Sequence, residues 1–235
     1  MKLIRTHYPY LLGTDLELEK KDVDHLVRLF EKKPDLVTEI LNGRNSVVRD
    51  RIFESIPVVI KFYRRGGLIR HVMRDAYLRS GQARSTAEYT MLKKAKELGI
   101  SCPEPLVWAM RGGLFYKAFL VTREIENQRS LVDLCQDNTG LCSEALHKTA
   151  AQVALLIKNR IHHVDLHPGN VLVDNHGNVH VIDFDKAHES PLSTEKLTDA
   201  IIKRWKRAVS KYNLPTMMSN VFERDLRSLI SLNLS

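Results

Sequence analysis

The sequence predicts an α+β protein, a single domain over residues 1–235 with two lobes. A strand-rich lobe is expected over about residues 1–122 and a mainly helical lobe over about residues 123–235. Three observations support this prediction. A length of 235 residues fits one large domain or two small lobes. Short apolar segments bounded by turn residues fall mainly in the first half, and the second half is richer in apolar residues at helical spacing.

The first lobe is expected to contain two helices and four strands. Asp22 to Leu41 begins with apolar residues at helical spacing, and Pro34 breaks or restarts this helix. A second helix runs from Thr86 to Leu98 and is closed by Gly99. The predicted strands are Ser46–Val48, Pro57–Tyr63, Leu106–Trp108 and Phe115–Thr122.

The second lobe is expected to begin with a long helix and a hairpin. Apolar residues recur at helical spacing over Ser143–Ile161. Two short apolar strands then flank the turn Asp174–Asn178, which is rich in Asn, Asp and Gly as β-hairpin turns are. From Thr194 onwards the chain is predicted to be mainly helical.

The positive charge of the chain is uneven. The formal net charge is +8, yet residues 61–84 hold seven Lys or Arg against one acid, and residues 196–212 hold six against one. Basic windows of this kind attract anions such as nucleotides, anionic lipids or phosphorylated sugars. A solvated surface is the alternative interpretation, and the presence of two such windows in one chain favours an anionic ligand.

The cysteines and the hydropathy point to a cytosolic protein. Cys102, Cys135 and Cys142 form neither a C-x-x-C pair nor an even framework, so they are predicted to be reduced thiols. The sequence has no apolar run of 18 residues, and its first 20 residues do not resemble a signal peptide. We therefore expect no membrane-spanning helix.

One motif carries the chemistry. Asp165 is followed five residues later by Asn170, and Asp183 comes thirteen residues after Asn170, at the end of the predicted hairpin. An aspartate in the first position orients and deprotonates an acceptor hydroxyl, whereas an asparagine and a second aspartate hold Mg²⁺ against the phosphates of ATP. Incidental carboxylates on a surface hairpin are the alternative. His163, Asp165, Asn170 and Asp183 all in register favour a catalytic loop that resembles the protein-kinase-like superfamily.

Two further residues are candidates for contacts to ATP. Lys61 ends the predicted apolar strand 57–61, where an ammonium can bind the α- and β-phosphates. Glu88, on the following helix, is the candidate partner of Lys61, although residues 85–88 also fit a capping box. Residues 42–48 contain one glycine and form only a weak candidate for a loop that covers the phosphates.

A zinc site is not expected, although six of the ten histidines fall between His162 and His188. The histidine pairs spaced four apart lie in a predicted loop and hairpin, where no helix places them on one face, and no cysteine joins them. His163 is interpreted as a residue that stabilises the loop.

A longer stretch resembles one family within this superfamily. Residues 62–70, with the sequence Phe-Tyr-Arg-Arg-Gly-Gly-Leu-Ile-Arg, and residues 75–78 are distinctive, and the likeness extends over roughly residues 58–210. These residues resemble the lipopolysaccharide kinases, and among them the 3-deoxy-D-manno-octulosonic acid (Kdo) kinases. The resemblance implies a protein-kinase-like two-lobe fold with ATP in a cleft between the lobes. It also implies transfer of the γ-phosphate to a hydroxyl of Kdo on a lipid A precursor.

The same resemblance implies cofactors, partners and a location. ATP and Mg²⁺ are expected as cofactors, with Lys61 and Glu88 at the nucleotide and Asn170 and Asp183 at both nucleotide and metal. Residues Arg64 and Arg65 are expected to bind the lipid-linked acceptor. The protein is expected to be cytoplasmic and peripheral on the inner membrane, at an anionic surface, with no nucleic acid as partner.

Some features leave other kinases open. Residues 167–169, His-Pro-Gly, are as similar to aminoglycoside and other small-molecule phosphotransferases as to Kdo kinases. A small atypical protein Ser/Thr kinase is a second alternative. Phe184-Asp185 in place of Phe-Gly, with no A-P-E motif and only a short segment before Thr194, argues against a regulated protein kinase. A catalytically inactive kinase fold that acts as a binding module is least favoured, because the sequence contains Lys61, Asp165, Asn170 and Asp183.

Overall fold

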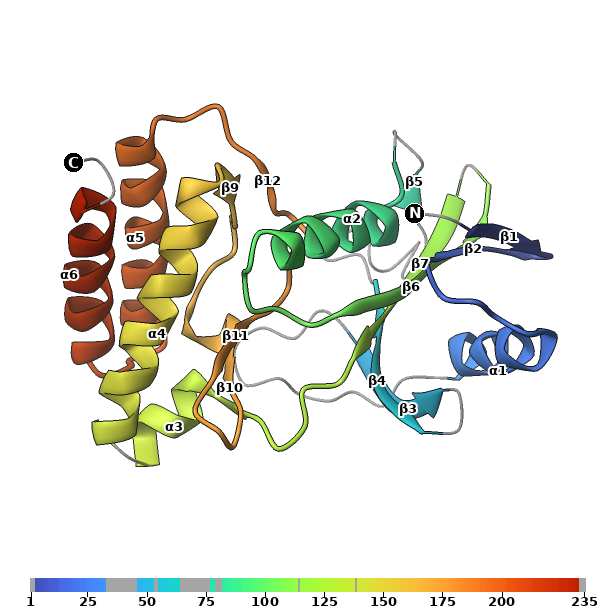
Figure 1. Cartoon of the computed structure of the whole chain (residues 1–235), viewed down its shortest axis with the longest axis horizontal. Helices are drawn as coiled ribbons and strands as arrows, with labels where there is room; N and C mark the ends of the chain where they lie inside the picture. Colours follow the sequence, from blue (N-terminus) through green and yellow to red (C-terminus); the bar gives the residue numbers. More distant parts are fainter. Residues whose placement is uncertain are drawn as a thin grey trace. The chain divides into compact units, whose positions relative to one another are not determined.

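The structure, a computed structural model, describes residues 3–32, 46–52, 55–63, 77–78, 82–113, 115–137 and 139–232. The chain divides into two compact units (Figure 1). The first unit consists of Met1–Thr90 and Glu104–Glu124, and the second of Met91–Pro103 and Ile125–Ser235. The large sheet belongs to the first unit and most of the helices to the second, which confirms the predicted α+β class. The boundary predicted near residue 122 stays a prediction.

An antiparallel sheet forms the body of the first unit. Its strands are β1 (Leu3–His7), β2 (Tyr10–Thr14), β3 (Ser46–Ile52), β4 (Ile56–Phe62), β5 (Tyr77–Leu78), β6 (Pro105–Gly112) and β7 (Phe115–Arg123). They lie in the order β1-β2-β6-β7-β4-β3, and β5 also pairs with β7. The four strands predicted for this lobe correspond to β3, β4, β6 and β7, whereas the sequence-based prediction does not include the hairpin of β1 and β2.

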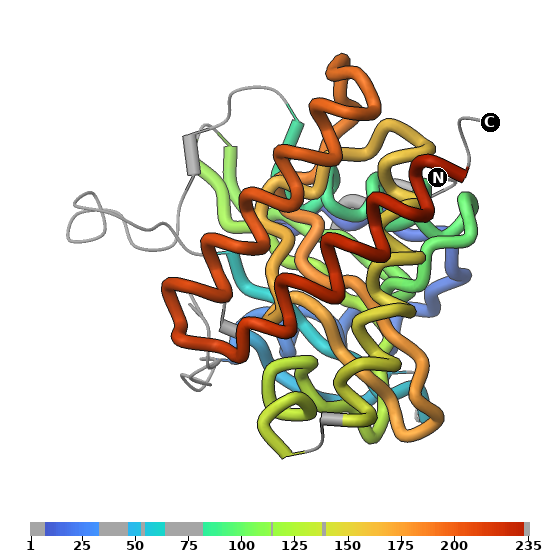
Figure 2. The backbone as a smooth tube through the Cα atoms, turned by 90° about the vertical axis from the view of Figure 1, so that its left-hand side faces the viewer, coloured from blue at the N-terminus to red at the C-terminus, as the bar shows by residue number. Residues whose placement is uncertain are grey.

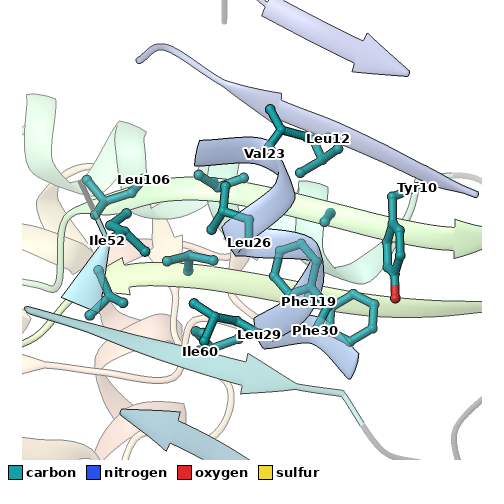
Figure 3. Close-up of a cluster of buried hydrophobic side chains, with 14 of the residues drawn as sticks. Tyr10, Leu12, Val23, Leu26, Leu29, Phe30, Ile52, Ile60, Leu106 and Phe119 are labelled. Atoms are coloured by element: carbon teal, nitrogen blue, oxygen red, sulfur yellow. The ribbon is translucent and has the colours of Figure 1, made fainter. Parts of the chain in front are cut away.

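A hydrophobic core lies between helix α1 (Lys20–Glu31) and one face of this sheet (Figure 3). The helix buries four residues along one stripe, which are Val23, Leu26, Leu29 and Phe30. Phe30 stacks on Phe119 of β7, with ring centroids 4.7 Å apart. Burying each of these large side chains contributes about 1.5–3 kcal/mol, so the core holds β4 and β7 firmly in register. The helix ends well before the predicted Leu41, and residues 33–45 lie outside the described part.

Helix α2 (Arg84–Glu97) follows β5 and matches the helix predicted from Thr86. Its end is formed as expected by Gly99, whose φ of +78° is left-handed, and the N–H of Ile100 donates to the carbonyl of Ala95. Tyr89, Leu92 and Ala95 are buried along the helix, and Glu88 is buried beside them. A buried carboxylate needs partners, which are described below.

The second unit is built around four helices: α3 (Leu131–Asp137), α4 (Thr139–Lys158), α5 (Thr194–Lys211) and α6 (Met217–Leu232). Helices α5 and α6 lie side by side, with α4 next to them (Figures 1 and 2). The ring of Trp205 stacks on Phe222, with centroids 4.1 Å apart, and its indole N–H donates to the carbonyl of Met218. These buried contacts fix the orientation of α5.

Short strands complete the second unit. Strands β11 (Val179–Val181), β10 (Val171–Val173) and β8 (Arg129–Ser130) form one antiparallel sheet, and β9 (Ile161–His162) pairs with β12 (His188–Glu189). Strands β10 and β11 are the predicted hairpin. Of the helices that the structure describes, none combines the length and the apolar character needed to span a membrane.

The prediction of three reduced cysteines is wrong for two of them. Cys135 of α3 and Cys142 of α4 form a disulfide, with Cα atoms 4.6 Å apart. The two helices follow each other almost directly, and this brings residues seven positions apart into disulfide range, although their spacing fits no familiar motif. Cys102 is a buried free thiol, and burial raises its pKa to about 12. Cysteine usage therefore no longer supports a reducing compartment.

Candidate active site

The first unit holds a buried ion pair. Lys61 lies on β4 and Glu88 on α2, and the lysine Nζ donates to both carboxylate oxygens, at 2.9 and 2.8 Å. The side chains are 12% and 3% exposed. The structure therefore brings together the two residues that were predicted to pair. The alternative capping box does not form, because the Ser85 hydroxyl donates to the carbonyl of Ala109 and the Glu88 carboxylate faces the sheet.

Tyr63 is a third member of this cluster, and the sequence-based prediction does not include it. Its hydroxyl donates to Oε2 of Glu88 at 2.5 Å. Its ring centroid lies 5.1 Å from Nζ of Lys61 and 5.5 Å from Cζ of Arg84. Tyr63 directly follows β4, and its N–H donates to the carbonyl of Ala118 in β7, so the chain is still extended beside β7 at this point. Residues two apart in an extended segment point to the same side, and the spacing of Tyr63 from Lys61 is therefore a usable signal.

In the second unit, a tightly hydrogen-bonded loop carries Asp165. The N–H of Leu166 donates to the carbonyl of His163 at 3.1 Å, and Leu166 is fully buried. After it, the 3-10 helix η2 (Pro168–Asn170) is capped by His167, whose Nδ1 accepts from the N–H of Gly169. Burial lowers the pKa of His167 to about 4, and the charge of Arg204 adds to this effect. His167 is therefore neutral at pH 7.

Asn170 links this loop to the hairpin. Its side-chain Nδ2 donates to the backbone carbonyl of Asp165 at 3.1 Å. Its own backbone carbonyl accepts from the N–H of Ile182 at 3.0 Å. Asp183 follows Ile182 directly, so the hairpin returns the second aspartate to the asparagine, as the spacing predicts.

Asp183 has an unusual backbone conformation. Its φ is +64°, in the left-handed region that non-glycine residues rarely adopt. Such conformations cost about 1–3 kcal/mol and cluster at functional sites. Asn127, Arg160 and Asn213 also have positive φ, so the conformation by itself does not assign a role to Asp183.

His163 supports both segments. Its Nε2 donates to the carbonyl of Ile182 at 3.0 Å, and its ring lies edge-on to Phe184, with centroids 4.9 Å apart. Burial lowers the pKa of this histidine. A neutral imidazole that holds the residue before Asp183 fits the predicted role of stabilising the loop. Among the described residues, no group of three or more His, Cys, Asp or Glu could hold a metal ion.

Two cations flank the carboxylate of Asp165. Nζ of Lys186 lies 2.7 Å from Oδ2, and Nε of Arg204 lies 3.9 Å from Oδ1. Lys186 comes from the segment after Asp183, and Arg204 from α5. Neither residue was among the predicted site residues. Arg204 is one of six basic residues in the window 196–212. Only the packing of α5 shows that this one lies beside Asp165.

The hairpin turn is held by one carboxylate. Oδ1 of Asp174 accepts from the N–H groups of His176 and Asn178, and Oδ2 accepts from the side chains of Asn178 and His180. Burial alone would raise the pKa of Asp174, but these hydrogen bonds outweigh it and lower the pKa far below its usual range. The other ring nitrogen of His180 lies 2.9 Å from the hydroxyl of Ser101.

Some predicted site residues lie outside the described part of the chain. Arg64 and Arg65 are among them, as is most of the basic window 61–84. Of the weak candidate loop 42–48, residues 46–48 are described, and they form the start of β3.

Comparison with known proteins gives the family. The lipopolysaccharide kinase (Kdo/WaaP) family matches residues 29–231. A 3-deoxy-D-manno-octulosonic acid kinase of Vibrio vulnificus strain YJ016 is 32% identical over 179 residues, which cover 75% of this chain and 74% of the relative. A protein of the same name from strain CMCP6 is 35% identical over 66% of each chain.

A more distant organism gives a similar result. The 3-deoxy-D-manno-octulosonic acid kinase of Xanthomonas campestris pv. campestris strain B100 is 33% identical over 54% of this chain and 52% of the relative. The match to the family spans far more than half of the chain and includes Lys61, Glu88, Asp165, Asn170 and Asp183. It confirms the resemblance and, since the family is kinase-like, the predicted fold class. The chain belongs to the lipopolysaccharide kinase (Kdo/WaaP) family.

Proposed function

We propose that this protein transfers the γ-phosphate of ATP to a hydroxyl of Kdo on a lipid A precursor. One observation carries the proposal: the side chain of Asn170 donates to the carbonyl of Asp165, and the N–H of Ile182, the residue before Asp183, donates to the carbonyl of Asn170. The family and the names of the relatives supply the acceptor class. Together they point to a sugar kinase of lipopolysaccharide biosynthesis.

Asp165 is the catalytic residue in this proposal. It accepts the proton of the attacking hydroxyl and orients that hydroxyl towards the γ-phosphate. Its side chain is 35% exposed, so an acceptor can reach it, while Leu166 and Asn170 hold its backbone. The exposed carboxylate on a fixed backbone supports the assignment.

Mg²⁺ fits the residues at the end of the hairpin. The Nδ2 of Asn170 is used by the backbone of Asp165, and this leaves the amide oxygen as the group available to a cation. Asp183 adds a carboxylate. Asn170 and Asp183 would hold the ion, and a bound Mg²⁺ would supply positive charge against the phosphates of ATP. Mg²⁺ prefers few protein oxygens plus phosphates, which agrees with a donor set of Asn170 and Asp183.

Lys61 contacts the nucleotide phosphates, and Glu88 holds its ammonium in place. Both carboxylate oxygens of Glu88 accept from the Lys61 ammonium, and Tyr63 is a further donor to Glu88. A preorganised ammonium of this kind stabilises phosphate charge without reorganising during the reaction.

Arg64 and Arg65 bind the lipid-linked acceptor, and the protein works as a peripheral protein on the cytoplasmic face of the inner membrane. The support is the net charge of +8 and the basic window 61–84. Each Lys or Arg near an anionic surface contributes about 1 kcal/mol, and salt screens the attraction. Replacing both arginines by alanine is expected to raise KM for the acceptor, least at high salt, and to leave KM for ATP nearly unchanged. If the double variant changes KM for ATP, or if KM for the acceptor depends neither on these two charges nor on the salt concentration, these residues do not belong to the acceptor site.

The function itself is tested by incubating the protein with Kdo–lipid A, ATP and Mg²⁺. Mass spectrometry should detect one added phosphoryl group on the Kdo-containing product. Casein and an aminoglycoside serve as competing acceptors in parallel reactions. Phosphorylation of either in preference to Kdo–lipid A would favour a protein kinase or a small-molecule phosphotransferase and reject the proposal.

A further inference from the structure

The cations beside Asp165 are not explained by the roles above. Lys186 forms a hydrogen bond to one carboxylate oxygen, and Arg204 approaches the other without reaching hydrogen-bond distance. Each oxygen of the candidate base therefore faces its own cation. A carboxylate whose two oxygens both lie close to cations is poorly placed to accept the proton of a hydroxyl. It can do so once another anion binds the two cations.

The contacts are weak enough to be exchanged. Lys186 is 59% exposed and Arg204 is 27% exposed. Exposed ion pairs contribute about 0–1 kcal/mol, because water competes for both partners. The side chain of Arg204 makes no hydrogen bond to any described residue. Its guanidinium can therefore offer a pair of N–H groups to a ligand.

The position of Arg204 is nevertheless fixed by the packing of its helix. The neighbouring Trp205 is fully buried against Phe222 and donates its N–H to Met218, so the backbone of α5 is fixed at this point. Lys186 follows Phe184, which is also fully buried, in the turn where the N–H of Ala187 donates to the carbonyl of Phe184. Two anchored segments thus present two cations to the same carboxylate.

We propose that Lys186 and Arg204 bind the carboxylate of the acceptor sugar, an inference that rests on the proposed function. The relatives are named as kinases of an octulosonic acid, and a sugar acid is ionised at neutral pH. A guanidinium binds a planar carboxylate through two parallel N–H groups, and an ammonium adds a point charge. When the acceptor binds, its carboxylate replaces Asp165 as the partner of both cations and leaves Asp165 to accept the hydroxyl proton. The pair then selects acidic sugars over neutral ones.

The experiment compares two acceptors on the wild-type protein and on three variants. The acceptors are Kdo–lipid A and its Kdo carboxamide, which has nearly the same shape but no charge. The variants are Lys186→Met, Arg204→Met and, as a control, Lys203→Met, which removes an exposed charge from the adjacent position of α5. Circular dichroism and thermal melting establish that each variant is folded.

The wild-type protein is expected to prefer the acid over the amide by about tenfold or more in kcat/KM, as hydrogen bonds to charged groups allow. Lys186→Met and Arg204→Met should each raise KM for the acid, reduce this preference and leave KM for ATP nearly unchanged. Both variants should lose less kcat/KM with the amide than with the acid. Lys203→Met should keep the full preference.

The outcomes separate this inference from the function on which it rests. Equal turnover of acid and amide by the wild-type protein would reject the carboxylate site while leaving the kinase activity in place. A changed KM for ATP in Lys186→Met would assign that lysine to the nucleotide instead. A raised acceptor KM with an unchanged acid preference would mean that the cations bind a lipid phosphate. Failure to phosphorylate either acceptor would reject the proposed function itself.

Discussion

Each unit of the molecule has a lysine–carboxylate pair among its candidate site residues, and these two pairs differ in their surroundings. Lys61 and Glu88 in the first unit are 12% and 3% exposed, whereas Lys186 and Asp165 in the second are 59% and 35% exposed. The N–O distances are similar, at 2.8 and 2.7 Å. Distance alone therefore does not distinguish them, and burial does.

Burial decides what each pair can do. A buried pair loses its hydration permanently, so removing one partner leaves an uncompensated charge and is costly. An exposed pair can be broken at little cost because water replaces either partner. The pair of the first unit therefore suits a fixed phosphate contact. That of the second unit suits a group that changes partners during the reaction.

The largest expected effect comes from the exposed carboxylate. Asp165→Asn should lower kcat by about 10²–10⁴, because it removes the general base. The melting temperature should hardly change, since the exposed ion pair contributes little to stability. Steady-state kinetics and thermal melting test the two parts separately. Turnover close to that of the wild-type protein would exclude Asp165 from the mechanism.

The next effect concerns nucleotide binding in the second unit. Asn170→Ala and Asp183→Ala should each weaken Mg²⁺-dependent binding of ATP, because each removes an oxygen ligand from a hard cation. Calorimetric titration with Mg–ATP measures the loss. The control is titration of the same variants with ATP in the presence of a chelator, where they should match the wild-type protein. If both variants bind Mg–ATP normally and remain active, the metal assignment is wrong.

The buried pair is expected to show the opposite behaviour to Asp165, with a large effect on stability. Glu88→Gln leaves the charge of Lys61 nearly buried without a counter-charge, which should cost about 3–5 kcal/mol in the free energy of unfolding. Lys186→Met should cost no more than about 1 kcal/mol. Chemical denaturation of both variants gives the comparison.

The double variant Lys61→Met/Glu88→Gln sharpens this test. It removes the buried charge and keeps an oxygen for the hydroxyl of Tyr63, so it should recover part of the stability without recovering activity. Equal stability losses in Glu88→Gln and Lys186→Met would show that burial does not separate the two pairs.

The parts of the site that could be predicted from the sequence depend on short-range geometry. Asp165 and Asn170 are five residues apart in one loop, and a hairpin with a recognisable turn returns Asp183 to them. Glu88 could be predicted as the partner of Lys61 because a helix and a strand each present one face. Periodicity and turn chemistry are local properties, so one sequence is enough to detect them.

The parts that could not be predicted depend on tertiary packing. The approach of Arg204 to Asp165 requires the orientation of α5, which the contact of Trp205 with Phe222 sets. The disulfide of Cys135 and Cys142 depends on α4 beginning almost directly after α3 ends. Neither arrangement leaves a periodic signal, because each depends on where separate elements meet.

The smallest expected effect concerns Asp174, whose carboxylate holds the turn of the hairpin. Asp174→Ala removes the acceptor of four hydrogen bonds, and with them about 1–3 kcal/mol of stability at pH 7. The folded pKa of Asp174 is lowered, so its stabilisation is present above the unfolded pKa of about 3.9 and declines as the pH falls below it. The difference in unfolding free energy between wild type and variant should therefore shrink below about pH 4. Asp199→Ala, which removes an exposed partner of Arg227, is the matched control and should show a smaller difference throughout. A difference for Asp174→Ala that is no larger than this control, or that does not depend on pH, would mean that the turn residues, and not the carboxylate, hold the hairpin that carries Asp183.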